Sequence, residues 1–323
     1  MSAYIVADIG GTNARFASIK NLLDHPYKLE QIQILPTSDH QTFSDALRHY
    51  LEITGQAAPK AMCAAIAGPV EGDTVRMTNL SWEFTCSDVS KELGMGEFIV
   101  MNDFAAVAAA CSRLEEDDLA NLKTGIKHPD APKAVFGPGT GLGVAGLVPY
   151  DNQWRPVPAE GGHVNLAPTT AFECEVLKAA LQKQLHVSAE TFLCGPGLVN
   201  LYQAICDVQN ETPQALKPSD ITQNALDGSD AQCVTTLSTF CSLLGAFAGN
   251  VALTYGAKGG VYIAGGVLPR FIDFVRKSAF IEKFGSKGVM SPYLNDISID
   301  VITHSETAFV GAAAWLEQHL SGR

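Results

Sequence analysis

Two segments, one in each half of the chain, repeat the same pattern of a β-rich run, a glycine turn and a second β-rich run. They span residues 4–19 and 134–148, and their turns are Gly10-Gly11-Thr12 and residues 137–141. Both turns carry a Gly-Thr pair. Each pattern predicts an antiparallel hairpin, because glycine supplies the tight turn and the flanking residues favour strands. Since the same unit starts both halves, we expect a duplicated α/β architecture with a cleft between the halves.

The rest of the chain alternates between strand-like and helix-like patterns. Further strands are predicted near residues 31–35, 61–67, 74–77, 98–101, 260–264 and 297–302. Apolar spacing predicts helices over residues 42–54, 87–93, 104–114, 170–185, 197–208, 218–226, 231–255 and 307–320, and another that starts at Pro269. We expect the strand that leads into Asn102-Asp103 to be the counterpart of the strand that leads into Gly265-Gly266.

Length and composition restrict the class of protein. At 323 residues the chain is long enough for two domains, and the acidic and polar stretch 115–132 is the best boundary. A net charge of −12 argues against a nucleic-acid partner or an anionic membrane, although backbone amides and a metal ion can still hold one nucleotide. The eight cysteines form no C-x-x-C pair, which predicts buried thiols in a reducing cytoplasm, without structural zinc or a disulfide framework. The sequence predicts no stretch apolar enough to span a bilayer.

The two glycine turns predict a phosphate site. Glycine-rich turns expose N–H groups that can surround phosphate oxygens, and threonine hydroxyls add donors. Asp8, at the first turn, suits a magnesium ion held through water. One such turn is usually an ordinary hairpin, but two in matching halves favour phosphate binding. The G-x-G-x-x-G match at residues 141–146 precedes a strand rather than a helix, so it does not indicate a dinucleotide fold.

The pair Asn102-Asp103 stands at the end of a predicted strand and the start of a helix. A carboxylate at such a position is well mounted for a general base. It is equally placed to cap the helix, as aspartate often does. The residue types alone leave both roles open.

A second polar group follows in the other half. Glu160 and His163 flank two glycines, and Glu190 comes after the next predicted helix. These side chains could bind a metal ion, could be a capping carboxylate and loop histidines, or could hydrogen-bond a polyhydroxylated ligand. The sequence pattern does not choose among these three.

The motifs together resemble the bacterial glucokinases of the proteobacterial type, which belong to the actin-like ATPase and sugar-kinase superfamily. The resemblance covers nearly the whole chain and follows the family's order. It is carried by residues 8–13, Met77-Thr78-Asn79 with Trp82, Asn102-Asp103-Phe104, residues 137–143, Glu160-Gly161-Gly162-His163, residues 186–190, residues 195–202 and Ala264-Gly265-Gly266.

The resemblance implies a role for each matching residue. Asp103 is the base that takes the proton from the 6-hydroxyl of D-glucose, and Asn102, Asp103, Glu160, His163 and Glu190 bind the sugar. The residues implied to hold ATP are Asp8, Gly10, Gly11, Thr12, Asn13, Gly137, Gly139 and Thr140 at the phosphates, and Gly265 and Gly266 at the adenosine. Asp8 orients Mg²⁺, and no structural zinc is expected. Pro138 departs from the family pattern, because it removes one possible amide donor.

The resemblance also implies an architecture. It predicts a two-domain actin-like (ribonuclease H-like) fold with duplicated halves of the βββαβα type. Residues 1–113 and about 304–323 would form a small discontinuous domain, and about 114–303 a large one. A cytoplasmic homodimer active in glycolysis is expected. The rival interpretations are a kinase for another hexose or an N-acetylated amino sugar, and a sugar-responsive regulator, which would need a DNA-binding segment.

Overall fold

The structure is a computed structural model that describes residues 3–68, 70–77 and 80–322, and its chain divides into two compact units. Unit 1 comprises Met1–Glu115, Pro149–Pro158 and His304–Arg323, and unit 2 comprises Glu116–Val148 and Ala159–Thr303. The C-terminal segment therefore packs with the N-terminal one. The motif residues Thr78 and Asn79 lie outside the described residues.

Unit 1 is built on a five-stranded sheet with the order β3-β2-β1-β4-β8. Its strands are β1 (Tyr4–Ile9), β2 (Asn13–Ile19), β3 (Glu30–Pro36), β4 (Ala61–Ile66) and β8 (Glu97–Asn102). A small sheet holds β5 (Val70–Glu71), β6 (Thr74–Arg76) and β7 (Glu83–Thr85). The helices are α1 (Phe43–Thr54), α2 (Cys86–Leu93), α3 (Asp103–Ala110) and α12 (Thr307–Ser321).

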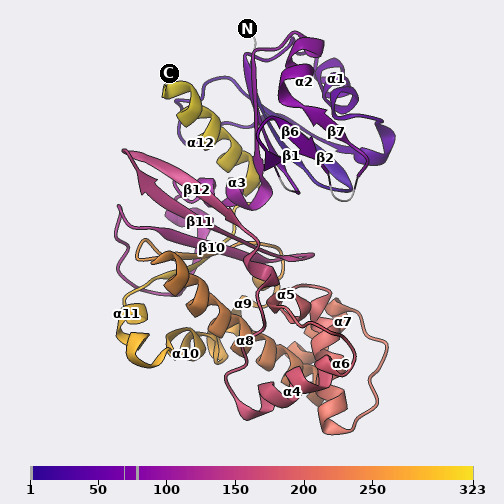
Figure 1. Cartoon of the computed structure of the whole chain (residues 1–323), viewed down its shortest axis with the longest axis vertical. Helices are drawn as coiled ribbons and strands as arrows, with labels where there is room; N and C mark the ends of the chain where they lie inside the picture. Colours follow the sequence, from indigo (N-terminus) through magenta and orange to yellow (C-terminus); the bar gives the residue numbers. More distant parts are fainter. Residues whose placement is uncertain (1–2, 69, 78–79, 323) are drawn as a thin grey trace. The chain divides into compact units, whose positions relative to one another are not determined.

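Two apolar clusters cover opposite faces of this sheet, because successive strand side chains point to opposite sides. Ile5 and Ala7 pack with residues of α1, such as Leu47, in one cluster. Val6 packs with residues of α3 and α12, such as Ala109 and Phe309, in the other. Figure 1 shows α12, the last helix of the chain, beside α3.

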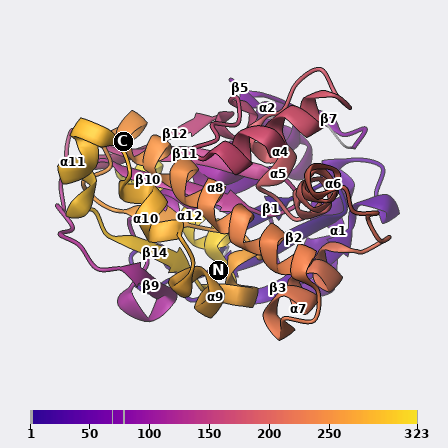
Figure 2. The same ribbon diagram turned by 90° about the horizontal axis from the view of Figure 1, so that it is seen from below.

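Unit 2 is built on a six-stranded sheet with the order β12-β11-β10-β13-β14-β9. The strands of this sheet are β9 (Leu119–Lys123), β10 (Lys133–Pro138), β11 (Leu142–Tyr150), β12 (Gln153–Ala159), β13 (Val261–Ile263) and β14 (Ile299–Ile302). The end of β11 and nearly all of β12 fall within residues 149–158, which are grouped with unit 1. The helices are α4 (Ala171–Leu181), α5 (Ala189–Phe192), α6 (Gly197–Gln209), α7 (Pro218–Asp227), α8 (Ala231–Tyr255), α9 (Ile272–Lys277), α10 (Phe280–Gly285) and α11 (Ser291–Asn295). Figure 2 shows α6 and α7 beside α8.

The two sheets confirm the predicted duplication and correct one detail of it. β1 pairs antiparallel with β2 and parallel with β4, and β10 pairs in the same way with β11 and β13. β8 is next to β4, and β14 is next to β13. The counterpart of β8, which leads into Asn102-Asp103, is therefore β14, whereas β13, which leads into Gly265-Gly266, corresponds to β4. The prediction that paired β8 with β13 was wrong, because similar strand ends do not determine the order of strands in a sheet.

Most predicted helices are confirmed at nearly the predicted ends. Helix α1, for example, is capped by Thr42, whose hydroxyl accepts the Asp45 N–H at 3.1 Å, and ends at Gly55 with φ of 64°. The predictions for residues 104–114 and 170–185 were too long. Helix α3 gives way to i→i−3 bonds, in which the N–H groups of Cys111 and Ser112 reach the carbonyls of Ala108 and Ala109 at 3.1 Å.

Several short elements were not predicted: β5, β7, β9, β12, α5, α10 and α11. β12 contains Pro156 and Pro158, which argue against a strand except at a sheet edge, and β12 is an edge strand. β9 lies inside the segment interpreted as a domain boundary. The pairing that stabilises β9 comes from β14, far along the chain, so no local pattern marks it.

Helix α8 corrects the statement that no stretch could span a bilayer. Among the described residues, this 25-residue helix is long and apolar enough to do so by length and composition. However, 83% of its most apolar window is buried inside the structure, which is typical of a core helix. Seven of the eight cysteines are buried as free thiols, as the sequence predicted, and Cys174 is exposed.

Candidate active site

The first glycine hairpin joins β1 to β2 in unit 1. Its turn is closed by the Gly10 N–H, which donates to the Asn13 carbonyl at 2.9 Å. Thr37, directly after β3, supports the tip, because its hydroxyl donates to the Gly11 carbonyl and its N–H to the Thr12 carbonyl, both at 2.9 Å. Gly11, Thr12 and Asn13 are exposed. Hydrogen bonds thus hold the turn of the hairpin in place, while the residues at its tip are accessible to solvent.

Asp8 stands directly opposite Arg15 in this hairpin. Arg15 Nη1 lies 3.3 Å from Asp8 Oδ2, and Arg15 Nη2 donates to Glu306, just before α12. Burial raises the pKa of Asp8 above its ordinary value, and the neighbouring Arg15 opposes this rise. The sequence analysis missed Arg15 and Glu306. The tight hairpin could have indicated Arg15 as the residue opposite Asp8, but no local pattern indicates Glu306.

Asn102 and Asp103 occupy the junction of β8 and α3. The N-cap is Asn102, whose Oδ1 accepts the N–H groups of Phe104 at 3.0 Å and Ala105 at 3.1 Å. Asp103 is the first residue of the helix, and its Oδ1 accepts the Phe104 N–H at 2.8 Å. The interpretation of Asp103 as the N-cap was wrong, since the preceding residue has that role. A carboxylate in the first turn is favoured by the helix dipole, so the position suits an ionised Asp103.

The second glycine hairpin joins β10 to β11 in unit 2. The Gly139 N–H donates to the Gly141 carbonyl at 2.8 Å, and the Gly195 N–H donates to the Gly139 carbonyl at 2.8 Å. Gly265, with φ of +86°, packs so closely that a Cβ there would lie 2.4 Å from the Pro138 carbonyl oxygen. The structure therefore brings the predicted phosphate turn and the predicted adenosine residues together, and only glycine fits at residue 265.

The three polar residues of unit 2 form one group around His163. His163 Nδ1 lies 3.9 Å from Glu190 Oε1, and His163 Nε2 lies 4.0 Å from Glu160 Oε2. Glu190 Oε2 also accepts the Leu142 N–H, at 2.6 Å, directly after the second glycine turn. Glu160 and His163 are largely exposed, whereas Glu190 is half-buried. Sequence reasoning placed these three residues in one site, and in the structure His163 lies within 4.0 Å of a carboxylate oxygen of each of the other two.

The metal interpretation of this group is not favoured. Across residues 3–68, 70–77 and 80–322, no group of three or more His, Cys, Asp or Glu side chains is arranged to hold a metal ion. Glu190 instead uses one oxygen for a backbone N–H, and His163 is exposed. This arrangement offers acceptors and a donor to a ligand with several hydroxyl groups.

A cavity of about 220 Å³ lies beside the Gly265-Gly266 turn. Its walls come from the loop before α6, from α7 and from the segment after Gly266, and they include Gly195, Leu198, Thr222, Val267, Arg270 and Phe271. The walls combine apolar surfaces with a few polar groups, as ligand pockets do. The sequence analysis identified Gly265 and Gly266 but not the α7 side of this cavity.

The repeated sheets and paired glycine hairpins define the class of protein, the actin-like ATPase fold. A solved structure of a ROK family glucokinase from Streptomyces griseus has the same fold, with a TM-score of 0.65 over 98% of this chain and 100% of that chain. At 19% identity, that similarity shows the fold alone.

The chain belongs to the glucokinase family. The model of that family matches residues 5–319. A glucokinase from Saccharophagus degradans is 55% identical over 98% of this chain and 99% of its own length. The solved structure of a glucokinase from an Antarctic psychrotroph is 37% identical, with a TM-score of 0.91 over 98% of this chain and 99% of that chain. These matches confirm the resemblance predicted from the motifs.

Proposed function

We propose that this chain transfers the terminal phosphoryl group of ATP to the 6-hydroxyl of D-glucose, giving glucose 6-phosphate and ADP. The observation that carries the proposal is the family match, which extends over nearly the whole chain. The geometry of each unit adds chemical support, since unit 1 offers a helix-mounted carboxylate and both units offer a glycine hairpin.

Asp103 is the proposed general base. Its carboxylate sits in the first turn of α3, where the helix dipole favours the ionised form that accepts a proton. A positioned base contributes about 10²–10⁴-fold to the rate, or roughly 3–5 kcal/mol of the barrier. Phosphoryl transfer depends mainly on positioning and on charge neutralisation, so the phosphate hairpins must supply the remainder.

The proposed sugar-binding residues are Asn102, Asp103, Glu160, His163 and Glu190. Asn102 uses its Oδ1 to cap α3, and its Nδ2 donates to the Gly68 carbonyl at 3.4 Å, so the second N–H of that amide is the part suited to a sugar oxygen. Glu190 uses Oε2 for the Leu142 N–H, and its Oε1 is the oxygen suited to a sugar hydroxyl. Asn102 and Glu190 thus combine structural bonds with a remaining polar group for the ligand.

ATP is assigned to the two hairpins and the turn beside them. Asp8, Gly10, Gly11, Thr12 and Asn13 of the first hairpin and Gly137, Gly139 and Thr140 of the second would hold the phosphates. Gly265 and Gly266 would lie against the adenosine, with the cavity of about 220 Å³ next to them receiving the base. Pro138 provides no N–H, so Gly139 and Thr140 are the better donors in the second turn.

A magnesium ion would reach this chain with the nucleotide. Asp8 suits it, because its carboxylate is only partly engaged, by Arg15, and keeps polar capacity for a water of the ion's shell. When bound, the ion would neutralise charge that develops on the phosphates. We also propose a cytoplasmic homodimer, as the sequence analysis expected.

A coupled assay for ADP release tests the function. Purified protein would receive ATP, Mg²⁺ and glucose, mannose, fructose or N-acetylglucosamine in turn. We expect the highest kcat/KM with glucose, since a site that hydrogen-bonds each hydroxyl rejects analogues that lack or invert one. A preference for another sugar by tenfold or more would instead assign the chain to a different hexose or amino-sugar kinase, and no activity with any sugar would contradict the proposal.

A further inference from the structure

Arg15 bridges two carboxylates that come from opposite ends of the chain. Its Nη1 lies 3.3 Å from Asp8 Oδ2, and its Nη2 donates to Glu306 Oε2. The guanidinium also lies 5.0 Å from the centre of the Phe309 ring, in the first turn of α12. Both arms of the guanidinium and one of its faces are therefore occupied within unit 1, so Arg15 is not arranged to bind a phosphate directly.

The loop that carries Glu306 is itself held in place. The Glu306 N–H donates to His304 Nδ1 at 3.0 Å, and the Thr307 hydroxyl donates to the His304 carbonyl at 2.7 Å. On the other side, Asp8 and Arg15 are directly opposed in the β1–β2 ladder. Because both ends are anchored, the bridge restricts the rotation of the Asp8 carboxylate about its side-chain bonds.

The charges of the bridge leave an excess of one negative unit. Two carboxylates surround one guanidinium, and the side chains of Asp8, Arg15 and Glu306 are only 25%, 26% and 22% exposed. At such exposure, water and salt screen the interactions less than at an open surface. An isolated Asp8–Arg15 pair would be neutral and would attract a cation weakly. Glu306 engages Arg15 as well, so the bridge keeps a net negative charge beside the first phosphate turn.

We propose that Arg15 is a positioning residue that orients Asp8 toward the magnesium ion of a bound nucleotide, and that Glu306 prevents Arg15 from neutralising Asp8. This inference rests on the proposed function, since it assumes a nucleotide at the first hairpin. It adds two residues that the motifs did not indicate. It also gives the C-terminal segment a task in nucleotide binding besides packing on the sheet.

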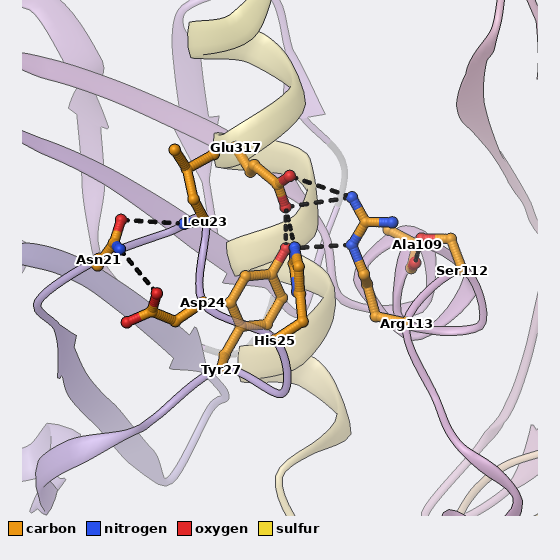
Figure 3. A network of polar contacts seen from close by, with 9 residues as sticks. All are labelled: Asn21, Leu23, Asp24, His25, Tyr27, Ala109, Ser112, Arg113 and Glu317. Atoms are coloured by element: carbon orange, nitrogen blue, oxygen red, sulfur yellow. Dashed lines mark hydrogen bonds and ion pairs between the residues drawn. The ribbon is translucent and has the colours of Figure 1, made fainter.

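The same helix offers a matched control at its other end. Glu317 of α12 bonds the Tyr27 hydroxyl, and its carboxylate lies 3.2 Å from Arg113 and 3.4 Å from His25 (Figure 3). It is three turns beyond Glu306, or roughly 16 Å along the helix. Glu317→Gln therefore removes the same charge from the same helix without touching the Arg15 bridge.

The test is the affinity for ADP with and without Mg²⁺, measured by isothermal titration calorimetry on the full chain. The variants are Glu306→Gln, Arg15→Lys and Glu317→Gln, each compared with the unsubstituted chain. We expect Mg²⁺ to increase the affinity of the unsubstituted chain for ADP, and Glu306→Gln to lower that increase about tenfold, a size typical of a nearby, partly screened charge. Affinity for metal-free ADP should stay equal or rise, because a negative charge near the phosphates has been removed.

Arg15→Lys should also reduce the magnesium-dependent increase, since an ammonium group cannot bridge two carboxylates as a planar fork does. Glu317→Gln should leave both affinities within about twofold, because its charge lies roughly 16 Å along the helix from Glu306, beyond the Debye length at about 0.1 M salt. A full magnesium-dependent increase in both Glu306→Gln and Arg15→Lys would overturn the inference while leaving the proposed function intact. Absence of ADP binding to the unsubstituted chain would contradict the proposed function itself.

Discussion

The two glycine hairpins have the same backbone plan but different surroundings. Aligned on their Gly-Thr pairs, the first has Asp8 where the second has Phe136, which is fully buried. The first is supported by Arg15 and Glu306, and the second by the backbone of Gly195 and the carboxylate of Glu190. The duplication thus preserved the glycine turn, which we propose holds phosphate in both units, whereas a carboxylate on the strand that leads into the turn is present only in the first hairpin.

The residues that support the two hairpins also differ in how far along the chain they lie from the hairpin. Glu190 and Gly195 come from α5 and the loop after it, about fifty residues beyond the second turn, within the same unit. Glu306 is 291 residues from Arg15. The first hairpin therefore depends on the C-terminal segment, and the second does not.

Removal of residues from 305 onward should have the largest effect. It deletes α12, whose side chains Phe309, Ala313 and Leu316 are fully buried against the unit 1 sheet. Burial of a large apolar side chain contributes roughly 1.5–3 kcal/mol, so Phe309 and Leu316 together contribute roughly 3–6 kcal/mol, a large part of the ~5–15 kcal/mol stability of a typical domain. Hydrogen exchange should show loss of protection in β1 and β4, with protection retained in α8. Limited proteolysis that leaves the N-terminal segment intact would show that this discontinuous domain was wrongly assigned.

Asp8→Asn, compared with a substitution in the second hairpin, should show that the two hairpins contribute differently to catalysis. We expect kcat/KM for ATP to fall by about 10²–10³-fold, the usual range for loss of a group that acts on charge in the transition state. Thr140→Ala, at the tip of the second hairpin, should cost at most about tenfold, since it removes a single neutral hydroxyl. Steady-state kinetics at saturating glucose would measure both. Equal losses would mean that the two hairpins contribute in the same way.

Glu190→Gln should have a smaller effect than Asp8→Asn. The substitution weakens a charge-assisted bond to the Leu142 N–H and alters a proposed sugar contact, together roughly 1.5–3 kcal/mol, or about 10- to 100-fold. The loss should appear in kcat/KM for glucose. Glu175→Gln is the matched control, because Glu175 is exposed on α4 and its ion pair, with Lys178, is local to that helix. A loss of similar size in the Glu175→Gln control would contradict the assignment of Glu190 to the sugar site.

Local patterns predicted the elements that position the site. Some signals act through neighbours in the sequence: glycine turns, helix caps such as Thr42 and Gly55, and continuous apolar runs such as residues 61–66. The elements that these signals predicted were found where expected. Both hairpins and the strand before Asn102 belong to this group. The roles of the site residues came instead from the family resemblance and remain predictions.

What could not be predicted depends on contacts between distant residues. β9 is a strand because β14 pairs with it, and β8 corresponds to β14 because of its place in the sheet. The sequence left Asp103 open as a base or as the cap of α3. Aspartate and asparagine cap helices almost equally well, and only the backbone conformation of Asn102 decides that Asn102 is the cap. The Arg15–Glu306 contact joins the two ends of the chain, so no window of sequence contains it.

Asp103→Asn is the most direct test of the central claim. Asparagine at the first position of α3 preserves the shape of the side chain but cannot accept the proton of a sugar hydroxyl. We predict that kcat falls at least about 100-fold, while the Kd for glucose changes little and the thermal unfolding temperature is maintained. Turnover close to that of the unsubstituted chain would show that Asp103 is not the base and would contradict the account.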